Sequence, residues 1–269
     1  MEAGKRSPTP SSLIARSLIA DSFPMIQYVN VYKTFDAPVL AGVNLRVETG
    51  ETLSVVGHSG TGKSVLLKLI NGLEKPERGQ ILLAGEDIVP YRESELRDVR
   101  RKVAMLFQGA ALFDSMTVGE NVAYGLHEQY EDWEEERVSA RVAECLEWVG
   151  LPGIEGRQPA NLSGGMKKRV GLARALAPGP EVILYDEPTT GLDPANCRRI
   201  NELIRSLQER LGVTSIVITH DMESAFHISD RIGLVKDRRI DLVVDVEEAK
   251  QQPPDELEQF LDGEGGEER

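Results

Sequence analysis

The segment that most constrains the fold of this chain is a glycine-rich stretch that matches the pattern G-x-x-x-x-G-K-[ST]. It consists of Gly57, His58, Ser59, Gly60, Thr61, Gly62, Lys63 and Ser64. An apolar run, Thr52 to Val56, precedes the stretch, and an apolar helical pattern from Val65 to Ile70 follows it. Glycines let backbone N–H groups turn inward around an anion, and the following helix directs the positive end of its dipole at that anion. The order of strand, loop and helix therefore predicts a phosphate-binding loop within an α/β fold.

Side chains at two places in the sequence are suited to a nucleotide and its metal ion. Lys63 supplies a positive charge for the outer phosphates, and the Ser64 hydroxyl is a ligand for Mg²⁺. The apolar run 182–185 delivers Asp186 and Glu187 to the end of a predicted strand, where the ligands of α/β sheets bind. We therefore predict that the chain binds ATP and Mg²⁺. Asp186 is the expected second metal ligand, and Glu187 is expected to point toward the γ-phosphate and polarise water.

Strand and helix patterns alternate along most of the chain. We predict strands at 26–32, 39–47, 52–56, 102–107, 181–185 and 213–219, and a terminal hairpin formed by 232–235 and 240–244. Helices are predicted over 65–70, 118–150 and 164–176. Continuous β-branched runs such as 213–219 are typical of buried strands in a parallel sheet. The order of elements predicts an α/β architecture.

The charge balance and the length of the apolar segments argue against some classes of partner. Asp and Glu number 44 against 31 Lys and Arg, a net charge of −13, so a nucleic-acid partner is not expected. Much of the acid lies in 128–136 and in 255–268, which we interpret as solvated surfaces. No apolar stretch approaches the ~20 residues that span a bilayer. Any link to a membrane is therefore expected to go through another chain.

The N-terminal segment has only a superficial likeness to a signal peptide. Its apolar stretch, 13–20, is interrupted by Arg16. We therefore interpret residues 1–24 as a flexible extension that precedes the recognisable fold.

Further motifs resemble those of the ABC ATPase family. The segment 162–166, Leu-Ser-Gly-Gly-Met, is similar to the family's signature motif. Gln108, at the end of one predicted strand, matches the Q-loop, and His220, at the end of another, matches the switch histidine. The segment 191–194, Gly-Leu-Asp-Pro, matches the D-loop. Phe35 stands where the family places an aromatic ring that stacks on adenine, with Tyr32 as the alternative.

The resemblance covers residues 25 to about 245 and implies a fold as well as an activity. The implied fold is an α/β P-loop ABC ATPase with a RecA-like core, an antiparallel β subdomain and a helical subdomain at about 109–165. The ABC ATPase domain is expected at 25–250, followed by a C-terminal tail with a short helix at 251–269. The implied activity is ATP hydrolysis coupled to transmembrane transport.

In this family two subunits enclose two ATP molecules, so the resemblance implies a homodimer. The helix start formed by Ser163, Gly164 and Gly165 is an anion-binding end that is expected to face the ATP held by the other subunit. Asp193 is expected to cross to that subunit. Each ATP site would then be complete only in the dimer.

The same resemblance implies roles inside the site. Glu187 is expected to orient or deprotonate the attacking water, and His220 to contact the γ-phosphate and hold the closed form. Gln108 is expected to reach both Mg²⁺ and the water, and to report to the helical subdomain. This chemistry needs positioning and charge neutralisation rather than a covalent intermediate.

A narrower resemblance concerns the cargo. The family's commonest signature ends in Gln, whereas this chain has Met166. Met166 with the basic residues after it, the segment 106–118 and the tail 254–263 look like the Mla/Mce-type ATPases that move phospholipids between membranes. This resemblance implies membrane permease subunits, a small accessory protein and an Mce-domain lipid-binding protein as partners. It also implies a cytoplasmic location, peripheral on the inner membrane through the permease.

Three alternatives stay open from the sequence. An ABC importer of small polar solutes, such as amino acids, would use the same motor, because other subunits choose the cargo. A non-transport ABC ATPase usually has two ATPase modules, long coiled-coil arms or zinc-binding cysteines, whereas this chain has one module and only Cys145 and Cys197. An unrelated P-loop kinase or GTPase would leave 162–166 and His220 unexplained.

Two apolar sets are candidate contact surfaces. Phe113, shortly after Gln108, is expected to contact a permease helix, whereas Leu112 fits either a contact or the core. In the tail, Leu257, Phe260 and Leu261 fall on one side of a short helix. We expect this stripe to lie on the partner subunit or on a small accessory protein, so that deleting 255–269 leaves nucleotide binding intact. Residues 263–269 are expected to be disordered.

Overall fold

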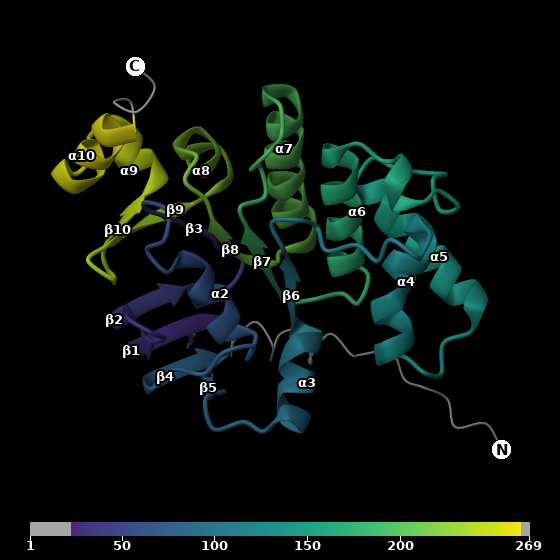
Figure 1. The fold of residues 1–269 in the computed structure, drawn as a ribbon, viewed down its shortest axis with the longest axis horizontal. Helices are drawn as coiled ribbons and strands as arrows, with labels where there is room; N and C mark the ends of the chain where they lie inside the picture. Colours follow the sequence, from purple (N-terminus) through teal and green to yellow (C-terminus); the bar gives the residue numbers. More distant parts are fainter. Residues whose placement is uncertain (1–22, 265–269) are drawn as a thin grey trace, which may run out of the picture.

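The computed structural model describes residues 23–264, and Figure 1 shows how their helices and strands are arranged. One sheet is four-stranded and antiparallel, in the order β2-β1-β4-β5, with β1 at Ile26–Thr34, β2 at Pro38–Val47, β4 at Arg78–Leu83 and β5 at Glu86–Asp87. The other is six-stranded, in the order β10-β9-β3-β8-β7-β6, with β3 at Thr52–Val56, β6 at Val103–Leu106, β7 at Val182–Asp186, β8 at Thr214–Ile218, β9 at Arg231–Lys236 and β10 at Arg239–Asp245. The N-terminal extension predicted for 1–24 lies outside the described residues, apart from its last two.

The strands at the centre of the six-stranded sheet are parallel and buried on both faces. Every residue of β3 and β8 is buried, and β7 is buried except at Asp186. Such continuous apolar strands are stable only where other elements cover both faces of the sheet, so the prediction of buried parallel strands is confirmed. Because these strands are parallel in register, with Val55 beside Ile218 and Ile218 beside Asp186, their carboxyl ends meet at one edge. Ligands of such sheets bind at this edge.

Helices cover the sheets and form a separate group at one end (Figure 1). Their bounds are α2 Lys63–Ile70, α3 Glu93–Lys102, α4 Val118–Gln129, α5 Glu135–Trp148, α6 Gly164–Leu176, α7 Pro194–Leu211, α8 Met222–Ile228, α9 Val246–Gln251 and α10 Asp255–Glu264. Figure 1 shows α4 and α5 at the opposite end of the molecule from β1 and β2. Among the described helices, none combines the length and apolar character needed to cross a bilayer.

Three buried clusters hold these parts together. In one, α4, α5, α6 and α7 pack against one face of the six-stranded sheet. A second fills the space between the antiparallel sheet, α2 and the other face of the six-stranded sheet. The third joins α8, α9 and α10 to β9 and β10. The architecture is the expected α/β core with an antiparallel β part and a helical part.

The single helix predicted over 118–150 is wrong, because the structure has two helices there. α4 ends at Gln129 and α5 begins at Glu135. Glu135 and Glu136 stand in the first turn of α5, where the helix dipole stabilises negative charge, so the acidic run favours a helix start at this point. Tyr130 fixes the junction, since its hydroxyl donates to the Pro178 carbonyl at 2.9 Å. The predicted stripe Val138, Val142, Cys145, Leu146 and Val149 is buried, as expected of a core-facing helix.

Other boundaries differ by one or two residues. α2 begins at Lys63 rather than Val65, and the strand predicted for 102–107 is shorter, because α3 extends to Lys102. The sequence analysis missed α3, which buries only Leu96 and Val99 among charged neighbours. It also missed the short pair β4 and β5. The predicted terminal hairpin is confirmed, since β9 and β10 pair antiparallel.

The helix α10, in the predicted tail, packs on the chain itself. Leu257 is 0% exposed and Phe260 is 6% exposed, and both belong to the cluster formed with α8 and β9. Leu261 packs against the same cluster. The expectation that a partner or an accessory protein covers this stripe is therefore wrong, because this chain's own apolar surface does so. Of the segment expected to be disordered, residues 265–269 lie outside the described residues.

Candidate functional site

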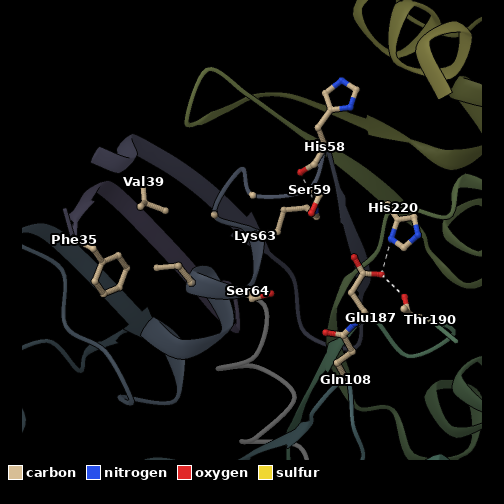
Figure 2. A pocket seen from close by; sticks show the side chains of 13 residues that line it. Phe35, Val39, His58, Ser59, Lys63, Ser64, Gln108, Glu187, Thr190 and His220 are labelled. Atoms are coloured by element: carbon tan, nitrogen blue, oxygen red, sulfur yellow. Dashed lines mark hydrogen bonds and ion pairs between the residues drawn. The ribbon is translucent and has the colours of Figure 1, made fainter. Parts of the chain in front are cut away.

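The carboxyl edge of the parallel strands forms a cleft of about 700 Å³, within the range of ligand-binding pockets (Figure 2). Its lining residues come from the loops after β1, β3, β6, β7 and β8 and from the starts of β2 and α2: Phe35, Val39, His58, Ser59, Gly60, Gly62, Lys63, Ser64, Val65, Gln108, Glu187, Thr190 and His220. Most of the side chains predicted from separate motifs therefore meet in one place. The residues after β3, β6, β7 and β8 meet there because the carboxyl ends of these parallel strands lie at this edge, whereas Phe35 and Val39 come from the antiparallel sheet.

The phosphate-binding loop requires glycine at two of its positions. Gly57 has φ 150° and Gly62 has φ 90°, both in the region that favours glycine. A Cβ on Gly57 would lie 2.8 Å from the Val235 carbonyl oxygen, and one on Gly62 would lie 2.5 Å from a methyl group of Val39. The loop is thus packed closely between β9 and β2, and this packing fixes its shape before any ligand binds.

Lys63 lies at the base of this loop. Its side chain is buried, and Nζ donates to the carbonyl oxygens of Gly57 at 2.6 Å and His58 at 2.9 Å. The Thr61 hydroxyl donates to the same His58 carbonyl at 2.8 Å. Figure 2 shows the His58 ring directed away from Lys63 and Glu187. The loop backbone therefore surrounds the positively charged Nζ of Lys63, and such a charge within a loop of backbone N–H groups favours the binding of an anion.

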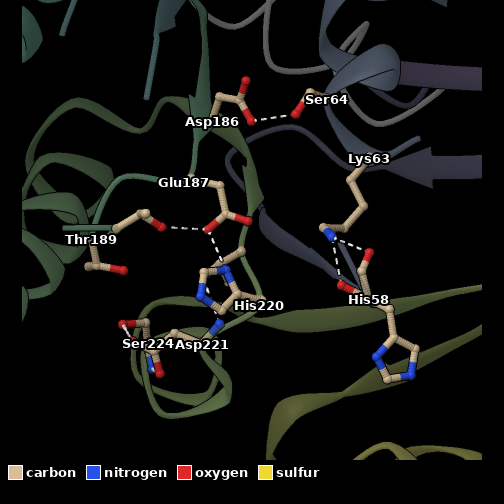
Figure 3. Close-up of polar contacts among 12 residues, drawn as sticks. His58, Lys63, Ser64, Asp186, Glu187, Thr189, His220, Asp221 and Ser224 are labelled. Carbon is tan, nitrogen blue, oxygen red and sulfur yellow. Dashed lines mark hydrogen bonds and ion pairs between the residues drawn. The ribbon is translucent and has the colours of Figure 1, made fainter. Parts of the chain in front are cut away.

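Ser64, which lines the cleft, is hydrogen-bonded to Asp186 at the end of β7. The Ser64 hydroxyl donates to Oδ1 of Asp186 at 2.7 Å (Figure 3). A hydroxyl and a carboxylate are oxygen ligands of the kind that Mg²⁺ prefers, and Mg²⁺ in nucleotide sites takes only one or two protein ligands besides water and phosphate oxygens. The pair fits Mg²⁺ bound together with a nucleotide.

Glu187 and His220 face each other beside this pair. His220 Nδ1 lies 2.9 Å from Oε2 of Glu187, and the Thr190 hydroxyl donates to the same oxygen at 2.9 Å (Figure 2). The Glu187 side chain is 14% exposed, whereas that of His220 is 56% exposed, so the histidine is on the solvent side. Glu187 has φ 49°, an uncommon backbone conformation for a residue other than glycine, and such conformations concentrate at functional sites.

The expected adenine-stacking residue also lies in the cleft. Phe35 lines it and is 51% exposed, with Nζ of Lys33 4.8 Å from its ring centroid. Tyr32, the alternative, packs instead against Arg78, whose guanidinium carbon is 4.3 Å from the ring centroid. Tyr32 is not among the described residues that line the cleft. An exposed ring at the rim can stack on a planar base.

None of the predicted residues Ser163, Gly164, Gly165 and Asp193 lines this cleft. Ser163 precedes α6 and accepts a hydrogen bond from the Met166 N–H at 3.3 Å, with Gly164 exposed beside it and Gly165 packed close to Asn196. Asp193 precedes α7, and the side chain and backbone of Asn196 hold the pKa of Asp193 below its ordinary value by hydrogen bonding. These residues form a second surface, centred on the α6 N-terminus.

The sequence analysis did not name as site residues three of those that line the cleft, Val39, Val65 and Thr190. Thr190 holds the Glu187 carboxylate, and Val39 packs against the phosphate-binding loop at Gly62. A threonine three residues after a carboxylate in a tight turn is a signal that could have identified Thr190. Val39 has no such signal, because its contact depends on how the antiparallel sheet lies against the core.

Comparisons with known proteins agree with this geometry. The family described as "ABC transporter" matches residues 40–190. "Methionine import ATP-binding protein MetN" of Caulobacter vibrioides is 44% identical over 219 residues, which are 80% of this chain and 65% of that protein. "Methionine import ATP-binding protein MetN 2" of Rhodococcus jostii is 42% identical over 222 residues, with 81% and 65% covered. This chain thus spans slightly less than two thirds of the length of these relatives.

Two solved structures have a similar fold. The ATP-binding cassette MJ0796, a dimer in a post-hydrolysis state bound to ADP and Pi, has a TM-score of 0.77 and 34% identity, covering 82% of this chain and 99% of that one. The cbiO1 protein of Clostridium perfringens, part of the ABC transporter complex cbiONQ, has a TM-score of 0.79 and 28% identity, covering 86% of this chain and 92% of that one. Because the family match spans more than half of the chain and the relatives match about 80% of it at more than 40% identity, this chain belongs to the ABC transporter family.

Proposed function

We propose that this subunit hydrolyses ATP in the cleft beside Glu187, as half of a homodimer, and that the hydrolysis drives a membrane permease that imports a small amino acid. The observation that carries the catalytic part is the convergence of the phosphate-binding loop, the Ser64–Asp186 pair and the Glu187–His220 pair at one sheet edge. The amino-acid part is supported by relatives named for methionine import.

ATP binding is assigned to the loop and the rim. The exposed ring of Phe35 stacks on adenine, and the backbone N–H groups of 57–62 and the start of α2 surround the phosphates. Lys63 exchanges its present carbonyl partners for oxygens of the outer phosphates. Ser64 and Asp186, with Gln108, would hold Mg²⁺, which neutralises charge that develops on the phosphates.

Hydrolysis is assigned to the carboxylate of Glu187. A water molecule attacks the γ-phosphorus as the bond from phosphorus to the β–γ bridging oxygen breaks, its proton passes to Glu187, and ADP leaves with the electrons of that bond. Thr190 keeps the carboxylate in place through Oε2. His220, now paired with the same oxygen, is close enough to turn toward the γ-phosphate and stabilise its charge.

The second surface is assigned to the other subunit's ATP. The N-terminus of α6 presents exposed Ser163 and Gly164 outside this chain's own cleft, and helix N-termini bind anions. In a symmetric dimer, each α6 start would complete the partner's site. The dimeric state of the MJ0796 relative supports this arrangement.

Phospholipid transport is the second candidate cargo. It is supported by Met166 in the signature and by the segment 106–118, which resemble Mla/Mce-type ATPases. The matched relatives support amino-acid import instead, and for that reason we place it first. The permease selects the cargo. The two candidates therefore differ in the molecule that should stimulate ATP hydrolysis, an amino acid or a phospholipid.

Reconstitution of the complete transporter tests both parts. The chain is co-purified with its permease, placed in proteoliposomes, and assayed for ATP-dependent L-methionine uptake and for transfer of fluorescent phospholipid, with Glu187→Gln as the inactive control. Methionine uptake that stops in Glu187→Gln supports the proposal. Phospholipid transfer without amino-acid uptake would contradict the proposed cargo but not the proposed ATP hydrolysis. Methionine uptake that persists in Glu187→Gln would contradict the catalytic role of Glu187.

A further inference from the structure

A buried lysine on α6 contacts the turn that carries Glu187. The Lys168 side chain is only 6% exposed, and Nζ donates to the carbonyl oxygens of Glu187 at 3.0 Å and Thr190 at 2.9 Å. Burial lowers the pKa of Lys168, and the nearby Cys197 and Glu187 oppose that effect. A buried ammonium is costly unless it is well hydrogen-bonded, so its place here calls for a reason.

The two carbonyl groups are the ends of one tight turn. Thr190 N–H donates to the Glu187 carbonyl at 3.4 Å, and Glu187 N–H donates to Ile218 at 2.9 Å, so the turn is closed on itself and tied to β8. The side chains of Glu187 and Thr190 line the cleft. Lys168 therefore holds the turn from behind, through the backbone, while the carboxylate faces the cleft.

The backbone that Lys168 holds is an uncommon one. Glu187 has φ 49°, and a residue other than glycine keeps such a conformation only where its surroundings impose it. Two charge-assisted hydrogen bonds from Lys168, at the two ends of the turn, stabilise it here together with the hydrogen bond from Glu187 N–H to the Ile218 carbonyl. Without them the turn can relax, and the carboxylate would leave its position beside His220.

The same helix connects this contact to the second surface. α6 begins at Gly164, directly after Ser163, and Lys168 lies five residues after Ser163, roughly 7.5 Å along a helix with 1.5 Å rise per residue. α6 is one rigid element, so a shift of its N-terminus also moves Nζ of Lys168. A change at the surface assigned to the partner's ATP thus reaches the carboxylate assigned to this subunit's ATP.

We propose that Lys168 is a positioning residue that fixes the Glu187 carboxylate for hydrolysis through the backbone of the turn 187–190 and links it to the N-terminus of α6. The inference rests on the proposed function of Glu187. It concerns the hydrolysis step and not ATP binding. The two hydrogen bonds from Lys168 go to the turn 187–190, and not to the phosphate-binding loop or to the Ser64–Asp186 pair.

The test compares four variants of the full-length chain, alone and with its permease. Lys168→Met removes the donors and keeps an unbranched buried side chain, Lys168→Arg keeps the charge, and Lys168→Gln keeps an amide donor. Lys167→Met is the matched control, since it removes the same charge from the neighbouring position of α6. The measurements are kcat and KM for ATP, the Kd for ATP, and the Tm of each variant.

Lys168→Met is expected to lower kcat about 10- to 100-fold, because the Glu187 carboxylate is no longer held in position for the attacking water, with the Kd for ATP changed less than about threefold. Lys168→Arg and Lys168→Gln should recover part of the rate, and Lys167→Met should leave it unchanged. If Lys168→Met fails to fold, Lys168→Gln is used instead, and it should likewise show a lower kcat with a nearly unchanged Kd for ATP.

Two results would overturn the inference. One is a wild-type kcat in both Lys168→Met and Lys168→Gln while Glu187→Gln is inactive, which leaves the proposed function standing. The other is a loss of ATP affinity as large as the loss of kcat, which would show a structural role in the nucleotide site. Full hydrolysis by Glu187→Gln would instead remove the proposed function and this inference together.

Discussion

The ring of Phe260, on α10, lies edge-on against the imidazole of His58 in the phosphate-binding loop, with 5.0 Å between the ring centroids. α10 thus contacts the nucleotide site from outside the cleft. A small cavity of about 230 Å³ adjoins this contact, between His58, the end of β9 and α10. This contact leads us to predict, against the expectation that deleting 255–269 leaves nucleotide binding intact, that α10 affects ATP binding.

Phe260→Leu tests this contact. Leucine keeps most of the buried apolar volume but removes the ring pair, which is worth about 0.5–1.5 kcal/mol, so we expect ATP binding to weaken about 2- to 10-fold. Phe226→Leu is the control, because Phe226 packs against the same buried cluster. The Kd for ATP decides the matter: equal affinities in the two variants would show that α10 supports the fold only.

Lys63→Ala tests the phosphate-binding loop. Nζ of Lys63 lies among the loop carbonyls, ready to bind phosphate oxygens, and hydrogen bonds to charged groups are worth about 1.5–3 kcal/mol. We expect the affinity for ATP to fall about 10- to 100-fold by direct titration. Lys68→Ala is the control, since Lys68 is exposed on the same helix. Equal ATP affinity in both variants would remove Lys63 from the site.

Phe113→Asp tests the surface that we expect to face the permease. Phe113 is 41% exposed and pairs with Tyr124, with 4.9 Å between the ring centroids, while Leu112 packs against the helical core. We expect the charge to abolish cargo-stimulated hydrolysis and transport, with basal hydrolysis by the isolated subunit retained. Leu211→Asp, at another exposed apolar position, should retain coupling. If the Tm of Phe113→Asp fell so far that the variant was unfolded at the assay temperature, the ring would be part of the core.

Complementation tests the composite sites. Lys63→Ala and Ser163→Arg homodimers each lack an intact site, whereas a mixed dimer has one, formed by Lys63 and Ser163 of different subunits. We expect a mixture of the two inactive proteins to hydrolyse ATP faster than either alone, and the wild-type rate per subunit to rise with protein concentration. A dilute monomer that turns over ATP at the full rate would contradict the dimeric site.

The sequence identified the side chains of the cleft because each stands directly after a strand or inside a glycine pattern. Gln108, Asp186, Glu187 and His220 needed only a parallel sheet to bring them together, and the apolar runs before them indicated that sheet. Lys168 could not be found in this way. Its contact with the Glu187 backbone depends on how α6 packs against the turn 187–190, which no local pattern specifies.

The tail shows the same limit. The spacing of Leu257, Phe260 and Leu261 indicated an apolar stripe, but not which surface it covers. Periodicity reports that a face is buried and leaves its partner undetermined. The missed helix α3 is the opposite case, in which Leu96 and Val99 bury a narrow face that charged neighbours conceal.

The most direct test of the central claim is phosphate release by Glu187→Gln in the presence of ATP and Mg²⁺, measured beside ATP binding and oligomeric state. A general base contributes about 10²- to 10⁴-fold to a rate, so we expect release to slow at least about 100-fold while ATP remains bound and the protein accumulates as a dimer. Phosphate release at the wild-type rate would contradict the account.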